Sequence, residues 1–110
     1  MSRDYYYILE DGIPKPISSI QEWGEWLEKA DRTVAKTKIG KVLVSTVFLG
    51  LDHQWGEGPP LLFETLVFEG LLDGEMERYS TLDEAKAGHE VMVERVRAEW
   101  TKMKTILKHK

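Results

Sequence analysis

Apolar side chains dominate two central runs of the chain, residues 42–51 and 61–69. Both runs are rich in β-branched and aromatic residues, and apolar residues occupy odd and even positions alike. A strand with two apolar faces is normally central in its sheet and covered on both sides. Only Glu64 and Glu69 interrupt the second run, one on each face. The pattern therefore predicts two central strands joined by the loop 52–60.

Shorter runs complete the predicted sheet. Residues 5–9 and 13–17 flank an Asp-Gly pair at 11–12, a dipeptide typical of tight hairpin turns. Prolines in the second of these runs confine it to a sheet edge or to non-strand structure, because proline has no N–H to donate. Residues 33–39 alternate in character and carry two lysines, which predicts another edge strand. Residues 75–80 form the last predicted strand.

Two segments have the three-to-four spacing of an amphipathic helix. The first begins at Ser18 or Ser19, because each has a glutamine or glutamate three residues later, the spacing of a capping box. It ends near Asp31. Its apolar stripe consists of Ile20, Trp23, Leu27 and Ala30.

The second helix begins after Ser80 or Thr81, where Thr81 and Glu84 again have capping-box spacing. If it continues to Ile106, it spans about 25 residues, or about 38 Å at 1.5 Å per residue. A small sheet does not need that length, so the last turns overhang the core, pack on another subunit or fray. Its apolar stripe consists of Leu82, Ala85, His89, Met92, Val96, Trp100, Met103 and Leu107.

These elements predict an α+β fold of the order β(β)-α-β-β-β-β-α. Connections of hairpin length make the sheet antiparallel, with four to five strands and two helices. We expect one domain over residues 1–110, with a basic helical tail over about 97–110. Either one helix covers each face of the sheet, or both cover one face and a second copy covers the other. Because two helices cannot easily cover both faces, a homodimer is predicted.

Composition restricts the class of protein. The 110 residues contain no cysteine, which excludes disulfides, thiol catalysis and cysteine-based zinc sites. The N-terminal segment has no signal-peptide pattern, and no apolar run approaches the roughly 18 residues of a membrane span. We therefore expect a cytoplasmic protein with no membrane partner.

Charge is segregated along the chain. Residues 42–77 contain seven acidic residues and no lysine or arginine, whereas residues 95–110 carry a net charge of +5. Neighbouring elements that compensate each other in space would explain this pattern, and so would an acidic surface directed at a basic partner. The acidic centre disfavours nucleic acid as a partner, except through the basic C-terminal helix.

The loop 52–60 holds the most reactive-looking residues. Its Gly-Glu-Gly segment is a poor phosphate cradle, because Glu57 repels phosphate and two prolines follow it. A tryptophan in a Gly-rich loop is hard to bury, and exposed tryptophan is a common anchor of protein interfaces. We therefore predict that the loop binds a protein partner. The predicted contact residues are Asp52, His53, Trp55 and Glu57.

A metal site is the chemical alternative for this region. His53 and His89 could join Glu64 or a loop carboxylate as ligands. Their spacing matches no metal motif, and a lone histidine on an apolar stripe is more often a hydrogen-bonded core residue. We therefore predict no catalytic residue, metal or cofactor, and these three residues remain the candidate ligands if a metal binds.

Three sequence blocks carry a resemblance to a known family. Residues 44–70 read VSTVFLGLDHQWGEGPPLLFETLVFEG and are followed by LDGEMERYST and EAKAGHEVMVERV. This arrangement resembles a family of small bacteriophage and prophage proteins, from Tyr5 to about Val96. The resemblance implies a phage origin and the cytoplasm of an infected host. At Trp55, Glu57 and Glu69 this chain departs from the residues usual in the family.

The leading functional interpretation is a non-enzymatic protein-binding module, such as an inhibitor of a host factor or a host defence system. The inhibitory role rests on association with other small acidic phage proteins. A small metal-dependent or nucleotide-processing enzyme is the first alternative. An accessory or structural phage protein is the second.

Overall fold

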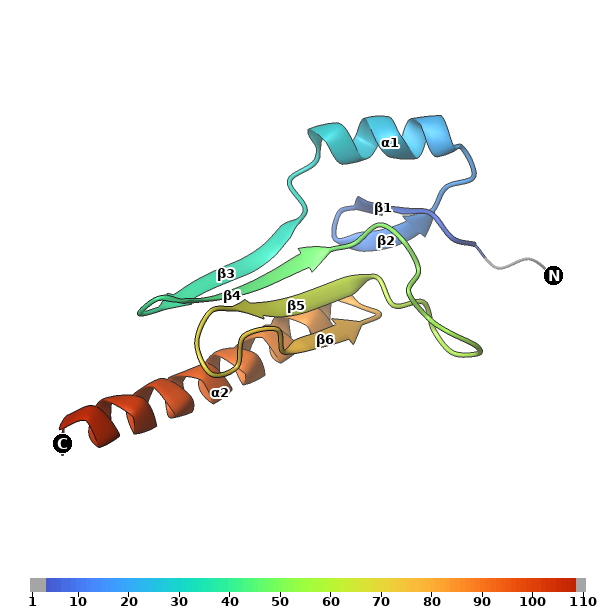
Figure 1. Cartoon of the computed structure of the whole chain (residues 1–110). Helices are drawn as coiled ribbons and strands as arrows, with labels where there is room; N and C mark the ends of the chain where they lie inside the picture. The colour runs from blue at the N-terminus through green and yellow to red at the C-terminus, as the bar shows by residue number, and fades with distance from the viewer. Residues whose placement is uncertain (1–3, 109–110) are drawn as a thin grey trace.

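The computed structural model describes residues 4–108 and confirms an α+β fold with two helices and two antiparallel sheets (Figure 1). The smaller sheet is a hairpin, and the larger sheet has the strand order β3-β4-β5-β6. The strands are β1 (Tyr7–Glu10), β2 (Ile13–Pro16), β3 (Thr33–Ile39), β4 (Val42–Phe48), β5 (Phe63–Phe68) and β6 (Met76–Tyr79). The helices are α1 (Ile20–Lys29) and α2 (Leu82–Lys108).

Helix α2 covers one face of the larger sheet. Val44 of β4 lies opposite Val67 of β5, and Phe48 lies opposite Phe63, so alternate residues of both strands face the helix. The buried apolar side chains of this layer are Ile39, Val42, Val44, Phe48, Phe63 and Val67 from the sheet and Ala85, Met92, Val93 and Val96 from the helix. This layer is the hydrophobic core of the fold.

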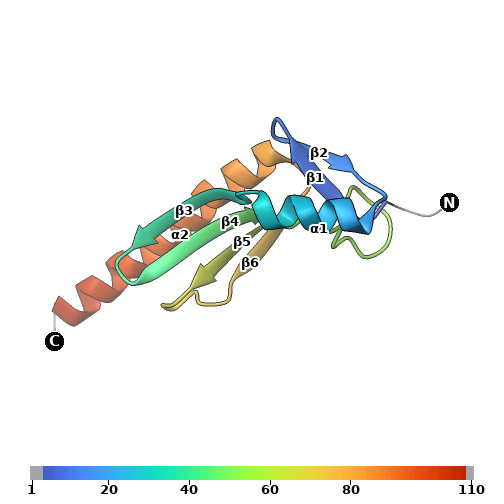
Figure 2. The same ribbon diagram turned by 90° about the horizontal axis from the view of Figure 1, so that it is seen from above.

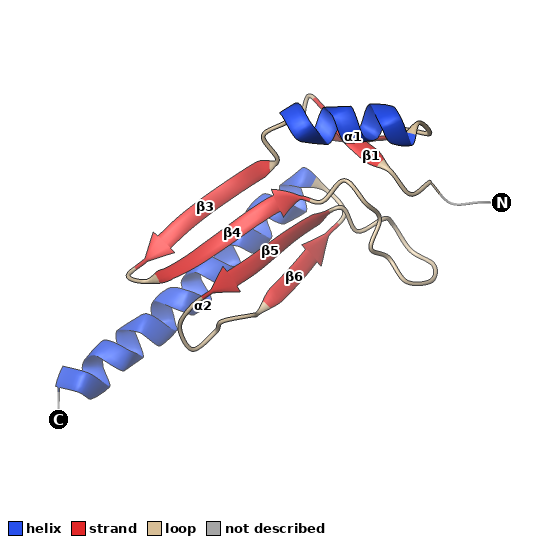
Figure 3. Ribbon diagram, turned by 45° about the horizontal axis from the view of Figure 1, so that its top comes forward, coloured by secondary structure: helices blue, strands red, loops and turns tan. Residues whose placement is uncertain are grey.

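No helix covers the opposite face of the larger sheet (Figure 3). Helix α1 lies beyond the end of that sheet, beside the β1–β2 hairpin (Figure 2). The indole N–H of Trp23 donates to the carbonyl of Gly50 at 3.0 Å, and the ring of Trp26 meets Phe48 edge-on. The expectation of one helix on each face, or both on one face, is therefore wrong. The tryptophans direct α1 to the strand ends instead.

Both central strands are shorter than the apolar pattern predicts. Strand β4 ends at Phe48 rather than at residue 51, because Gly50 takes a left-handed conformation with φ 78°. Strand β5 begins at Phe63 rather than at residue 61, because the N–H of Leu61 donates to the side chain of Asp52. The apolar residues at these strand ends thus belong to the loop between them.

The predicted helix starts are confirmed. The Ser19 hydroxyl accepts the N–H of Glu22 at 3.2 Å. The Thr81 hydroxyl accepts the N–H of Glu84 at 3.1 Å, while the Glu84 carboxylate accepts the N–H of Thr81 at 3.0 Å. The second arrangement is a complete capping box, which satisfies N–H groups that have no partner within the helix.

Helix α2 extends well beyond the sheet, as its sequence length predicts (Figure 1). Its 27 residues correspond to about 40 Å at 1.5 Å per residue. The last two residues of the predicted basic tail, and the first three of the predicted domain, lie outside the described residues. Within residues 4–108, neither helix combines the length and the apolar character that crossing a membrane requires.

Candidate functional site

Asp52 closes the base of the loop between β4 and β5. Its Oδ1 atom accepts the backbone N–H groups of Gln54 at 2.8 Å and Leu61 at 3.0 Å. Its own N–H donates to the carbonyl of Tyr5 at 3.0 Å, and the residue is only 5 % exposed. A carboxylate makes strong hydrogen bonds to N–H groups. Asp52 therefore holds the two ends of the loop together rather than facing outward as a contact residue.

Two further hydrogen bonds stiffen the loop above Asp52. The N–H of His53 donates to the carbonyl of Leu61 at 3.1 Å, and the side-chain amide of Gln54 donates to the carbonyl of Pro59 at 3.2 Å. Gly58 makes room for that amide. It has φ 136°, and a Cβ there would lie 2.9 Å from the Gln54 nitrogen. The loop therefore has a defined shape of its own.

The tip of the loop projects away from the sheet (Figure 1). Trp55 is 92 % exposed, and Glu57 is also exposed. A cleft of about 170 Å³ lies at the foot of the tip. The cleft is lined by Tyr5, Asp52, His53, Gln54 and Trp55. Of the four predicted contact residues, Trp55 and Glu57 thus face outward, His53 is half-buried in the cleft wall, and Asp52 is buried.

The candidate metal ligands do not come together. His89 lies on the α2 side of the larger sheet, beneath β3 and β4. Glu64 points to the opposite face, where its carboxylate pairs with the Arg78 guanidinium at 3.0 Å. His53 lies in the loop. Within residues 4–108, no three histidine or carboxylate side chains are arranged to hold a metal ion.

His89 instead belongs to a row of polar side chains that crosses the whole sheet, here termed the polar row. The row takes one residue from each strand of the larger sheet and one from α2. Its members are Thr37, His89, Thr46, Thr65 and Tyr79. His89 is 1 % exposed, and Thr46 and Thr65 are fully buried. Buried polar groups require hydrogen-bond partners, and the row supplies them.

One direction of donation satisfies every group in the polar row. The Tyr79 hydroxyl donates to Thr65 at 3.1 Å, which leaves the Thr65 hydrogen for Thr46 at 2.5 Å. The Thr46 hydroxyl then donates to Nδ1 of His89 at 2.7 Å. The Nε2–H of His89 therefore donates to the Thr37 hydroxyl at 2.9 Å. This order fixes the neutral Nε2–H tautomer of the imidazole.

Burial shifts the pKa of both titratable members of the polar row, His89 and Tyr79. Desolvation lowers the pKa of His89, and the nearby charge of Glu90 only partly opposes that effect. Desolvation also raises the pKa of Tyr79. The hydrogen bond to Thr65 lowers this pKa, and the negative charge of Glu77 raises it. Both side chains are therefore held in their neutral forms, as a buried hydrogen-bonded network requires.

The sequence interpretation found His89 but missed the threonines around it. Thr37, Thr46 and Thr65 lie at inward positions of strands whose other inward residues are apolar. That repetition is the available signal, since a lone threonine on a strand is unremarkable but an inward threonine on each of three neighbouring strands suggests a network. In the sheet Thr46 lies opposite Thr65, while Thr37 lies opposite Val44. Comparison with protein-family models, curated proteins and solved structures finds no match to this chain.

Proposed function

We propose that this chain is a non-enzymatic protein-binding module that engages its partner through the loop 52–60. The observation that carries the proposal is the 92 % exposure of Trp55 on a loop whose base is closed by Asp52. Leaving a large aromatic ring in water has no benefit for folding, and buried tryptophan is a frequent energetic centre of interfaces. Because the loop already has its shape, little conformational entropy is lost on binding.

The charge around the loop favours a partner with a basic surface. Glu57 lies at the exposed tip, and no lysine or arginine occurs in residues 42–77. The rings of Tyr5 and Trp55 border the cleft, and aromatic faces attract lysine and arginine side chains. We therefore propose that a basic side chain of the partner enters the cleft, with Trp55 covering it and Glu57 contributing long-range attraction.

The resemblance to small phage proteins supports a setting for this binding. In the cytoplasm of an infected host, the partner would be a host or phage protein, and the role we propose is inhibition of a host factor. The enzymatic alternative depended on His53, His89 and a nearby carboxylate meeting, and among residues 4–108 these side chains are not arranged to hold a metal ion.

Affinity capture from bacterial lysate tests the proposal. The bait proteins are the wild type, the double variant Trp55→Ala/Glu57→Ala, and Ile13→Ala. Ile13 is a matched control, since it is an exposed apolar residue on the β1–β2 hairpin and far from the loop in sequence. We expect a protein that the wild type and Ile13→Ala both retain and the double variant loses. Its affinity for the wild type is then measured by calorimetric titration.

The binding energies to be expected are large enough to measure. Removal of a central interface tryptophan costs about 2 kcal/mol or more, which weakens binding by roughly 30-fold. Raising the salt concentration from 50 to 500 mM should weaken the wild type further, because the proposed attraction is electrostatic. Identical sets of recovered proteins for all three baits would remove the loop from the function.

A further inference from the structure

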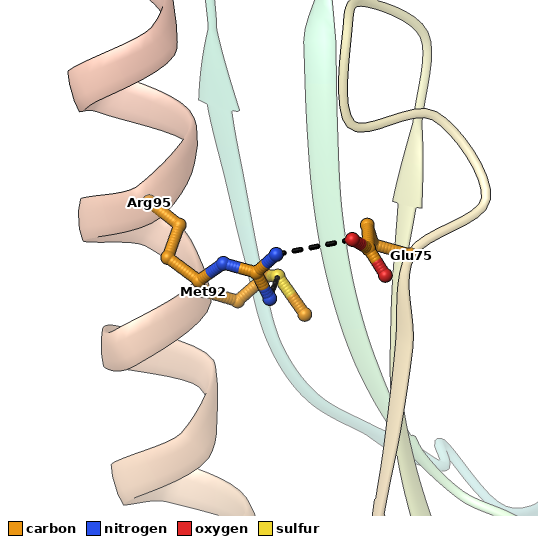
Figure 4. A network of polar contacts seen from close by, with 3 residues as sticks. All are labelled: Glu75, Met92 and Arg95. Atoms are coloured by element: carbon orange, nitrogen blue, oxygen red, sulfur yellow. Dashed lines mark hydrogen bonds and ion pairs between the residues drawn. The ribbon is translucent and has the colours of Figure 1, made fainter.

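The end of α2 is a second surface that the fold leaves without a cover. Val96 is the last buried residue of the helix, and every residue of 101–108 is exposed. Arg95 makes the last ion pair between α2 and the rest of the fold, with Nη2 3.1 Å from the Glu75 carboxylate (Figure 4). Trp100 packs against the hydrophobic core, with its ring beside Gly40. Residues 101–108, here termed the overhang, lie beyond both.

The overhang is apolar along one side. Met103 and Leu107 continue the stripe that Val96 and Trp100 begin, and Leu107 is 62 % exposed. Between this side and the β5–β6 turn lies a groove of about 270 Å³, whose opposite wall includes Leu71 at 64 % exposure. The overhang propagates from the packed part of α2, so its helical form alone requires no partner. Its uncovered apolar stripe is the feature that a partner would cover.

The charges at the end of α2 and in the β5–β6 turn indicate what covers the overhang. Residues 97–108 carry four basic side chains and one acidic side chain, Glu99, which pairs with Lys102 at 3.5 Å. The β5–β6 turn, residues 68–77, carries four acidic side chains and no basic one. Glu75 already pairs with Arg95 of the same copy, which leaves Glu69, Asp73 and Glu77. The exposed apolar residue of the turn on the groove side is Leu71, whereas Phe68 and Met76 lie with Leu66 on the open face of the sheet. The overhang and the turn are thus complementary in charge, and each presents an apolar side chain to the groove.

We infer that a second copy of this chain covers the overhang, in a two-fold dimer in which each basic overhang packs against the acidic β5–β6 turn of the other copy. A two-fold axis makes the contact reciprocal, so both overhangs and both turns are used. The overhang and the turn lie at the same end of the molecule (Figure 1). Two molecules that meet at this end place each overhang in the groove of the other.

The size of the contact sets the expected strength. An overhang of eight residues is about 12 Å long and about 10 Å wide, so the four apposed surfaces bury on the order of 500 Å². That area is below the range of stable interfaces and is typical of weak, transient contacts. We therefore expect a weak dimer that dissociates in the high micromolar range and weakens as salt rises, because a large share of its complementarity is electrostatic.

Charge reversal tests the inference with two variants that should each fail alone and succeed together. The overhang variant is Lys104→Glu/Lys108→Glu, and the turn variant is Glu69→Lys/Glu77→Lys. All four side chains are exposed, so both variants are expected to fold, which circular dichroism checks. In sedimentation velocity, we expect the wild type to dimerise, each variant to be monomeric, and an equimolar mixture of the two to form a heterodimer.

Two further variants separate this dimer from other assemblies. Leu107→Asp places a charge in the apolar groove and should raise the dissociation constant at least tenfold. Leu66→Lys alters the open face of the larger sheet, on the side away from α2, and should leave dimerisation unchanged. A monomeric wild type at 500 µM, a mixture that remains monomeric, or a dimer lost only in Leu66→Lys would each overturn the inference.

Discussion

Acidification should weaken the fold through His89. In the folded protein both imidazole nitrogens are bonded to threonine hydroxyls, and Nδ1 accepts from Thr46. A proton on Nδ1 would turn that acceptor into a donor. It would then face the hydroxyl hydrogen of Thr46, which is also a donor. To remove the conflict, the Thr46 hydroxyl would have to donate to Thr65 instead, and the Thr65 hydrogen would then lose its acceptor in the polar row. The folded state therefore resists protonation, in addition to the desolvation that lowers the pKa of His89.

The sign and size of the effect follow from proton linkage. In the unfolded chain His89 takes up a proton near its ordinary pKa of 6.5, while in the folded chain it stays neutral to a lower pH. The contribution to stability is therefore complete above pH 6.5 and is lost as pH falls from 6.5 to the folded pKa. Within that window the free energy of unfolding decreases by at most about 1.4 kcal/mol per pH unit.

Urea unfolding followed by tryptophan fluorescence, at pH 7.5, 6.5, 6.0 and 5.5, measures this slope. The comparison is between the wild type and His89→Leu. At pH 7.5, His89→Leu should be less stable by about 1–3 kcal/mol, because Thr46 loses its acceptor. It should nevertheless have a flatter pH dependence. Parallel curves for wild type and His89→Leu would refute the reasoning.

Three other substitutions test single contacts. Asp52→Ala should open the loop and accelerate chymotrypsin cleavage after Trp55 about tenfold, whereas Asp52→Asn keeps an acceptor and should be cleaved at close to the wild-type rate. Gly88→Ala should lower the free energy of unfolding by about 1–3 kcal/mol, because its Cβ would lie 2.2 Å from the Tyr79 ring; an unchanged urea midpoint would contradict that contact. Thr81→Ala removes the N-cap of α2 and should cost about 1 kcal/mol in the same assay, with Thr81→Ser close to wild type.

Local patterns account for most of the elements that the sequence predicts correctly. Both capping boxes, the tight turn at residues 11–12 and the length of α2 depend on residues close together in the chain. The path of α1 depends on a contact between Trp23 and Gly50, which are 27 positions apart. Periodicity identifies which side of a helix is apolar, but it does not identify the surface that this side will meet.

The features of the candidate site also differ in whether the sequence predicts them. The exposure of Trp55 follows from its glycine-rich surroundings, and the sequence predicts it. The burial of Asp52 follows from the N–H of Leu61, nine positions away, and is not predictable from composition. The sequence carries a partial signal of this role, because an aspartate whose carboxylate accepts the N–H two residues later forms a common type of turn. The polar row required the register of three strand pairs, which only the folded sheet provides.

The hydrogen bonds at the base of the loop have a consequence for how this surface can change. Because Asp52 and His53 fasten the chain to Leu61, the exposed residues Trp55 and Glu57 can be exchanged without altering the strands on either side. Related sequences could thus acquire new partners by variation at these two positions. The same arrangement makes the loop a suitable place to graft a foreign peptide, with its two ends already held at a fixed separation.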